Sequence, residues 1–181
     1  TYGQSPEIMM ISCCDSRVDP ETIFNAMPGE LFVARNVANL IPPYEIGGKF
    51  HGVSAGIEFA VLNLRVKHIV ILGHANCGGV KAALDQSATI QTEAMFISKW
   101  MSMLDEARLA IVASDKLKTQ AEKLDALEKE CIKTSIRNLR TFPFVAEREN
   151  KGKLNIHGAH FDIKSGTLSV LNHSRDMFFV L

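Results

Sequence analysis

The stretch IVILGHANCGGVKAAL, from Ile69 to Leu84, decides the fold. It begins with four apolar residues, Ile69 to Leu72, as is typical of a strand buried on both faces of a parallel sheet. A polar loop containing three glycines follows, and from Val80 to Leu84 the apolar residues return and predict the start of a helix. A strand that leads into a helix through a short loop is the repeating unit of α/β proteins.

Two earlier apolar runs, Ile8 to Ser12 and Leu31 to Ala34, are bounded by polar residues, glycine or proline and predict two more buried strands. Between the second and third strands lies GVSAGIEFAVLNL, residues 52–64, whose apolar residues recur at helical spacing. A strand, a helix and a strand in this order form a right-handed crossover, with the carboxyl ends of the strands at one edge of the sheet. The predicted fold class is α/β, with an open, mainly parallel sheet flanked by helices.

The second half of the chain completes this picture. Residues 93–139 predict two helices separated near Ala113 to Asp115, and their charged residues are expected on solvated faces. Residues 153–171, KLNIHGAHFDIKSGTLSVL, predict a hairpin around the KSG turn that adds an antiparallel strand at the sheet edge. No linker or repeat interrupts the sequence, so residues 1–181 are expected to form one domain.

Composition excludes several classes of function. Twenty basic and twenty acidic residues give a formal charge of zero, which offers no electrostatic basis for binding nucleic acid or an anionic membrane, so the substrate is expected to be small. No apolar run approaches the ~18 residues of a membrane span, and the first residues do not form a secretion signal. The four cysteines do not form a disulfide framework. We expect a cytoplasmic protein, although a targeting segment removed from the N-terminus would change this.

Thiol and imidazole groups stand at two predicted strand ends. Cys13 ends or follows the first strand, and His74 and Cys77 follow the third. If these strands are neighbours in a parallel sheet, the three side chains can converge. Zinc binds thiolates and imidazoles, and three protein ligands leave a fourth position open for water, as in catalytic sites. The short His-x-x-Cys pattern is weak by itself.

The full pattern, Cys13-x-Asp15-Ser16-Arg17 together with His74-x-x-Cys77-Gly78-Gly79, resembles the β-class carbonic anhydrases in residue types and in their separation. The resemblance extends through residues 28–44 and 52–79, and it covers the first half of the chain more closely than the second. It implies a parallel α/β sheet with zinc at its carboxyl edge and the interconversion of carbon dioxide and bicarbonate. It also implies a homodimer, or a higher oligomer built from dimers, with the site near the subunit interface.

The resemblance assigns roles to matching positions. Cys13, His74 and Cys77 would bind Zn²⁺, and a zinc-bound hydroxide would be the nucleophile. Asp15 would orient that hydroxide and Arg17 would hold Asp15. The implied substrate-binding residues are Gln4 as a donor to bicarbonate, Phe32, Val37 and Phe59 as an apolar wall, and Gly78 as a backbone amide donor.

Two details of the resemblance concern regulation and assembly. Relatives in which the aspartate can move onto zinc carry a tryptophan three residues before the first ligand, where this chain has Met10, so Asp15 is expected to pair with Arg17 instead. Relatives also use a helical segment before the first strand to embrace a partner subunit. We expect that segment to be missing from this chain.

Two alternatives stay open. The same zinc site could hydrolyse carbon disulfide or carbonyl sulfide, as certain members of the superfamily do. A non-enzymatic zinc or thiol-switch module is the other alternative, in which Cys14 or another fourth ligand closes the metal site. Against it, Cys14 is expected to be a packed or inert thiol, since adjacent residues of an extended chain point in opposite directions. Cys131 is expected in the core.

Overall fold

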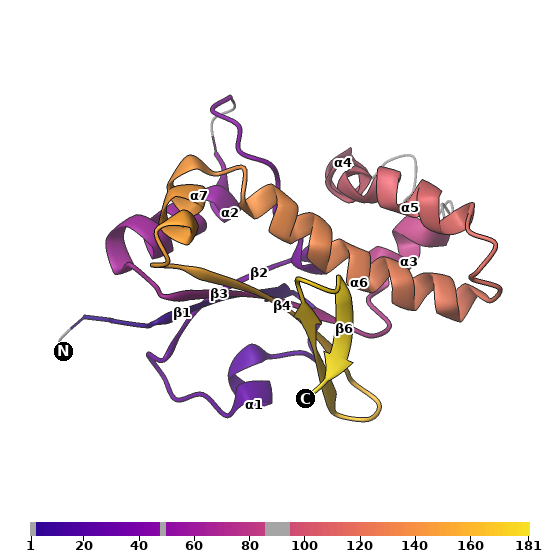
Figure 1. Ribbon diagram of the computed structural model, residues 1–181, viewed down its shortest axis with the longest axis horizontal. Helices are drawn as coiled ribbons and strands as arrows, with labels where there is room; N and C mark the ends of the chain where they lie inside the picture. Colours follow the sequence, from indigo (N-terminus) through magenta and orange to yellow (C-terminus); the bar gives the residue numbers. More distant parts are fainter. Residues whose placement is uncertain (1–2, 48–49, 86–94) are drawn as a thin grey trace.

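The computed structural model describes residues 3–47, 50–85 and 95–181, which contain a six-stranded sheet (Figure 1). The strand order is β2-β1-β3-β4-β5-β6; the first four of these strands in the sheet are parallel, and β5 and β6 continue it antiparallel. The strands are β1 (Ile8–Cys13), β2 (Leu31–Asn36), β3 (His68–His74), β4 (Asn155–Asp162), β5 (Thr167–Asn172) and β6 (Met177–Val180). The predicted α/β class, the three core strands and the hairpin are confirmed. The hairpin is β4–β5, and β6 adds a second antiparallel strand that the sequence did not predict.

The helices connect and cover this sheet. They are α1 (Pro20–Phe24), α2 (Gly52–Glu58), α3 (Gly78–Asp85), α4 (Met95–Met101), α5 (Asp105–Val112), α6 (Gln120–Leu139) and α7 (Pro143–Asn150). The crossover helix predicted for residues 52–64 is present, although its second half, Phe59–Leu64, is π-helical. The predicted break near Ala113 to Asp115 separates α5 from α6, but the first of the two predicted helices is divided into α4 and α5 by the 3-10 turn Ser102–Leu104. A capping box between Thr119 and Glu122 begins α6. The expected helix start at residue 93 lies outside the described residues.

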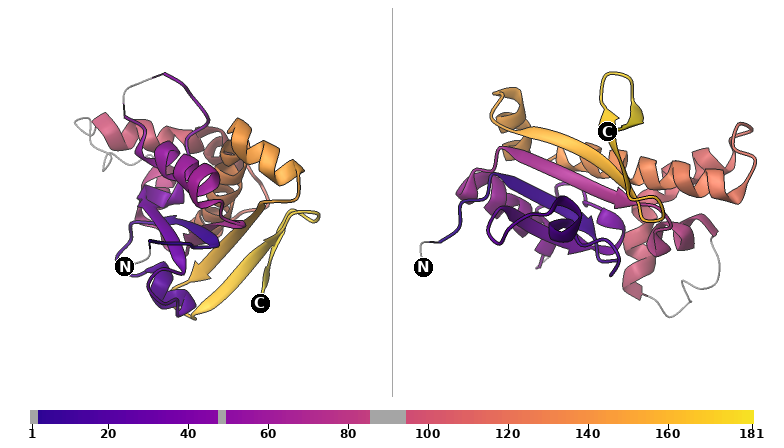
Figure 2. Two further views of the ribbon diagram at one scale, coloured as in Figure 1. Left: turned by 90° about the vertical axis from the view of Figure 1, so that its left-hand side faces the viewer. Right: turned by 90° about the horizontal axis from the view of Figure 1, so that it is seen from below.

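The sheet has one thickly covered face and one thinly covered face (Figures 1 and 2). Because successive side chains of a strand point to opposite faces, Met9 and Ile11 face the main core with the residues of α2, α6 and α7, whereas Met10 faces the other side with Ile23 of α1. Helix α6 lies along β3 and β4. This arrangement leaves the carboxyl edge of the parallel strands facing the loops that precede α1 and α3.

Helix α6 approaches the sheet closely because two strands have a glycine beneath it. A Cβ atom at Gly73 of β3 would lie 2.7 Å from Ile132 Cδ1, and one at Gly158 of β4 would lie 2.9 Å from Ile132 Cγ2. Both distances are shorter than carbon atoms tolerate. Ile132 is fully buried and fills the space that the two missing side chains leave. The depth of α6 on the sheet is therefore set by Gly73, Gly158 and Ile132.

Replacing Gly158 with alanine is expected to lower the free energy of unfolding by about 1–3 kcal/mol, the usual cost of overpacking a core. The added methyl group would also meet Ile136 Cδ1 at 3.1 Å and Leu171 Cβ at 3.2 Å, so no single side-chain rotation can relieve it. Urea unfolding measures the change. Gly52→Ala is the matched control, because nothing lies within 4 Å of a Cβ at Gly52. Equal stabilities of the two variants would contradict the packing argument.

Two charged side chains of the helical region lie inside the protein. Arg108 of α5 is 8% exposed and Glu128 of α6 is 4% exposed. The expectation that the charged residues of this region occupy solvated faces is wrong for these two. Within the described ranges, none of the helices combines the length and the apolar character needed to cross a bilayer.

Candidate metal centre

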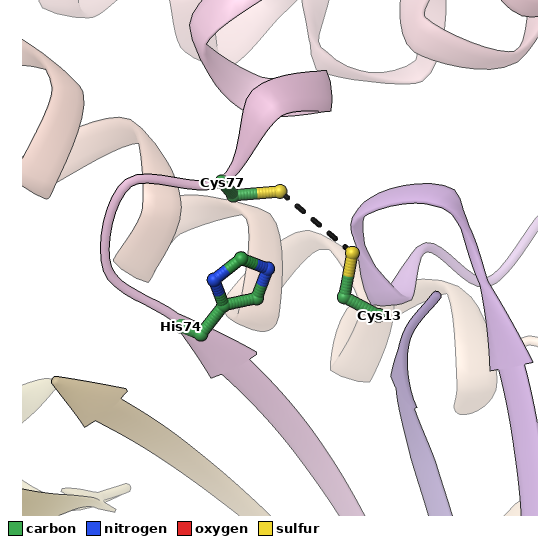
Figure 3. Close-up of side chains that lie close together, drawn as sticks. All are labelled: Cys13, His74 and Cys77. Atoms are coloured by element: carbon green, nitrogen blue, oxygen red, sulfur yellow. Dashed lines mark hydrogen bonds between the residues drawn. The ribbon is translucent and has the colours of Figure 1, made fainter. Parts of the chain in front are cut away.

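Three side chains from two neighbouring strand ends meet at the carboxyl edge of the sheet (Figure 3). Cys13 is the last residue of β1 and His74 the last of β3, and these strands pair in parallel with Ser12 opposite Leu72. Cys77 lies three residues beyond His74, immediately before α3. The ligand atoms of Cys13, His74 and Cys77 all lie within 4.8 Å of one another, and all three residues are buried. The predicted convergence of the three residues is confirmed.

The donor atoms suit a zinc ion. Two sulfurs bound at ~2.3 Å to one tetrahedral zinc lie roughly 3.8 Å apart, and Cys13 Sγ and Cys77 Sγ are 3.9 Å apart. His74 Nδ1 donates to the Ala75 carbonyl over 3.0 Å, so in the neutral ring the lone pair is on Nε2. Among the described residues, His74 Nε2 is buried without a hydrogen-bond partner. A buried acceptor without a donor next to two thiols is the arrangement that a metal ion would complete.

The two sulfurs lie within hydrogen-bond reach of each other, and either thiol can donate to the other. Their hydrogen bond lowers the pKa of Cys13, whereas the same bond and burial raise the pKa of Cys77. The pair therefore holds one negative charge readily and resists a second one. A divalent cation removes that resistance, because it stabilises both thiolates.

A carboxylate and a guanidinium flank the three ligands. Asp15 Oδ1 accepts from Arg17 Nε over 2.9 Å and from its backbone amide over 3.0 Å, and Oδ2 accepts from Arg17 Nη2 over 2.7 Å. These hydrogen bonds hold the pKa of Asp15 well below its ordinary value, so the carboxylate is ionised at neutral pH. Asp15 Oδ2 lies 3.9 Å from His74 Nε2. The carboxylate thus borders the Cys13–His74–Cys77 group, while both of its oxygens accept hydrogen bonds from Arg17.

Arg35 of β2 fixes the loop that carries these groups. Its Nε donates to the Cys13 carbonyl over 3.0 Å and its Nη2 to the Asp15 carbonyl over 2.7 Å. Sequence reasoning did not find this role, because backbone carbonyls have no residue pattern. Asp19, which also lies near Arg35, accepts from the Thr22 amide and begins α1. The segment from Cys13 to Asp19, which contains Asp15, is therefore fixed by Arg35 at its start and by the cap of α1 at its end.

The comparisons with known proteins agree with this geometry. The family model described as carbonic anhydrase matches residues 8–168. The chain belongs to the β-carbonic anhydrase family. It is 38% identical over 171 residues to beta carbonic anhydrase 3 of Arabidopsis thaliana. The matched region covers 93% of this chain and 65% of that protein, so the chain spans slightly less than two thirds of that curated relative.

Solved β-carbonic anhydrases share the fold. The structure of the β-carbonic anhydrase CcaA superposes with a TM-score of 0.91 at 30% identity and covers 99% of this chain and 79% of that one. One of two tetrameric β-carbonic anhydrases from Sordaria macrospora superposes with a TM-score of 0.79 at 32% identity, covering 94% of this chain and 82% of that one.

The substrate-binding residues suggested by resemblance to β-carbonic anhydrases fall into two groups. Gly78 directly follows Cys77, and Val37 contacts the start of α3, since a Cβ at Gly79 would lie 2.8 Å from Val37 Cγ1. Phe32, by contrast, pairs with Met9, four positions before the level of Cys13. That offset is roughly 13 Å along the strands.

Gln4 and Phe59 are also distant from the metal cluster. Phe59 packs on Phe32 with ring centroids 5.9 Å apart. Gln4 lies four residues before Ile8, where β1 begins, and so precedes the end of β1 opposite the carboxyl edge; Figure 1 marks the N-terminus near that end. One copy of the chain therefore brings Val37 and Gly78 to the cluster but not Gln4, Phe32 or Phe59.

The remaining cysteines are separate from the cluster. Cys14 is exposed, and its backbone amide donates to the Asn36 carbonyl. As expected, Cys14 is not part of the Cys13–His74–Cys77 group, but it is exposed rather than packed in the interior. Cys131 is fully buried, as predicted, and its pKa is raised by burial. Neither thiol closes the group formed by Cys13, His74 and Cys77.

Proposed function

We propose that this protein catalyses the reversible hydration of carbon dioxide to bicarbonate and a proton. The observation that carries the proposal is the buried group of Cys13, His74 and Cys77, which is bordered by Asp15. Arg17 donates hydrogen bonds to both carboxylate oxygens of Asp15. In the reaction, a hydroxyl oxygen forms a bond to the carbon of carbon dioxide, one C=O π pair moves to its oxygen, and a proton is released.

Cys13, His74 and Cys77 would hold zinc, which supplies Lewis acidity that lowers the pKa of water toward ~7 and so makes a nucleophile available near neutrality. Asp15 accepts a hydrogen bond from the attacking hydroxyl group and directs a lone pair toward the substrate. Arg17 keeps Asp15 ionised and in place through charge-assisted bonds. The Gly78 amide, at the start of α3, is available as a donor to a substrate oxygen.

Assembly completes the substrate pocket in this proposal. Gln4, Phe32 and Phe59 lie away from the metal cluster of their own chain, yet a pocket for carbon dioxide needs an apolar wall and a donor for bicarbonate. A second copy of the chain would supply them in a homodimer or an oligomer built from dimers. The relative from Sordaria macrospora described above is tetrameric.

Stopped-flow hydration of carbon dioxide, measured on the same preparation as the zinc content, tests the proposal. We expect about one zinc per chain and hydration well above the buffer rate. The release of hydrogen sulfide from carbon disulfide or carbonyl sulfide is assayed in parallel. Sulfide release with negligible hydration would overturn the proposal in favour of the hydrolase, and absence of both activities from zinc-loaded protein would favour a non-enzymatic module.

A further inference from the structure

The buried carboxylate of Glu128 accepts a hydrogen bond from the backbone of Cys77. We propose that Glu128 is a positioning residue that fixes the zinc ligand Cys77 through its backbone amide, and that His160 holds Glu128 in turn. Glu128 lies on α6, and its side chain does not belong to the Cys13–His74–Cys77 group. The inference rests on the zinc site of the proposed function, which it extends beyond the ligands to their support.

The contacts form a short chain from strand to helix to ligand. The Cys77 backbone amide donates to Glu128 Oε1 over 3.0 Å. The other carboxylate oxygen, Oε2, lies 3.4 Å from His160 Nε2 on β4. Glu128 and His160 are 4% and 5% exposed, so both interactions are shielded from water. Shielding strengthens each bond and makes its loss more costly.

The segment between His74 and Cys77 needs such support. Asn76 has a φ of 55°, in the left-handed region, and so turns the chain sharply just before the ligand. The Cys77 carbonyl accepts from the Lys81 amide over 2.9 Å within α3, and its amide is held by Glu128. With both polar backbone groups of Cys77 fixed, the side chain has a defined starting direction toward Cys13.

The carboxylate itself indicates a purpose, because burying an ionised or polar group is unfavourable unless its partners compensate. An apolar residue would pack α6 on the sheet without that cost but would leave the Cys77 amide without an acceptor. Asp125 also lies near Glu128 and His160. Its Oδ2 pairs with Lys129 Nζ at 2.7 Å, and Glu128 Oε1 accepts from the Cys77 amide, so these residues support the proposed zinc ligands rather than a second metal.

Zinc affinity tests the proposal directly. Glu128→Met keeps most of the side-chain volume and removes the acceptor, and we expect the zinc dissociation constant, measured by competition with a chromogenic chelator, to rise about 10- to 100-fold. Glu128→Gln keeps an oxygen for the Cys77 amide and should restore affinity close to that of the wild type. His160→Ala should weaken zinc binding less than Glu128→Met, because the acceptor remains but loses its partner.

Ser135→Ala is the matched control for loss of a buried polar contact on the same helix. Ser135 is fully buried and donates to the Asn39 carbonyl over 3.0 Å, away from Cys77. Melting temperatures are recorded with and without zinc for each variant. We expect the zinc-induced rise in melting temperature to shrink for Glu128→Met and to be unchanged for Ser135→Ala, since only Glu128→Met changes the affinity for zinc.

The outcomes separate this inference from the proposed function. Wild-type protein that binds no zinc would overturn both. Wild-type protein that binds zinc, together with a Glu128→Met variant of equal affinity, would overturn the positioning role alone. If Glu128→Met does not fold, the zinc affinity of Glu128→Gln decides. A dissociation constant for Glu128→Gln that is raised about 10- to 100-fold would overturn the positioning role, because this variant keeps the acceptor oxygen.

Discussion

Replacing His74 with alanine is expected to abolish both zinc binding and the hydration of carbon dioxide, the largest effect expected of any single substitution. His74 supplies the one nitrogen among the three side chains, and because Nδ1 donates to the Ala75 carbonyl, Nε2 is the nitrogen available to a metal ion. The two cysteines that remain would leave the ion without a third protein ligand, and catalytic zinc sites normally have three. The hydration rate should fall by orders of magnitude, to the rate in buffer alone.

Metal analysis and stopped-flow hydration measure this result. Wild-type protein stripped by a chelator should show the same loss and regain activity when zinc is added, whereas the His74→Ala variant should not respond. His51→Ala is a suitable control, because His51 is exposed and is not part of the cluster. A His74→Ala variant with one zinc per chain and wild-type hydration would rule out the assigned ligand set.

Replacing Asp15 with asparagine is expected to lower kcat for hydration about 100-fold with the zinc content unchanged. Asparagine has nearly the shape of aspartate, but it lacks the charge that binds Arg17 through two hydrogen bonds and orients the nucleophile. Because Arg17 holds the pKa of Asp15 well below its ordinary value, the carboxylate does not titrate near neutrality. The loss should therefore be similar at every pH from mildly acidic to alkaline.

Asp19→Asn provides the comparison for the effect of charge. It removes a negative charge from the same loop, and asparagine begins a helix as well as aspartate does. Asp19→Asn should keep nearly the wild-type kcat. Equal kcat values for wild type and Asp15→Asn would contradict the orienting role, and loss of zinc from Asp15→Asn would show that Asp15 supports the metal instead.

The convergence of Cys13, His74 and Cys77 is predictable from the sequence because Cys13 and His74 stand where strands end. Cys13 and His74 close two apolar runs, and neighbouring parallel strands bring such ends together whatever their separation in the chain. Glu128 gave no comparable signal: it lies 51 residues after Cys77 on a helix rich in charged residues, and only the tertiary structure shows that it faces inward. The position of β6 and the π-helical segment Phe59–Leu64 also depend on packing that no local pattern specifies.

The substrate pocket was predicted only by family resemblance, and the structure shows why residue patterns were insufficient. Phe32 lies on a strand whose end borders the metal cluster, so sequence position alone suggests that it is nearby. The register places it beside Met9 instead, close to Phe59. If a second copy completes the pocket, as proposed above, the pattern of one chain cannot reveal it.

The glycines beneath α6 also affect the position of Glu128. Ile132, which fills the gaps at Gly73 and Gly158, follows Glu128 by one helical turn on the same face of α6. A methyl group added under Ile132 would push the helix outward and carry Glu128 away from Cys77. A substitution at Gly73 or Gly158 is therefore expected to weaken metal binding, although neither residue would touch the ion.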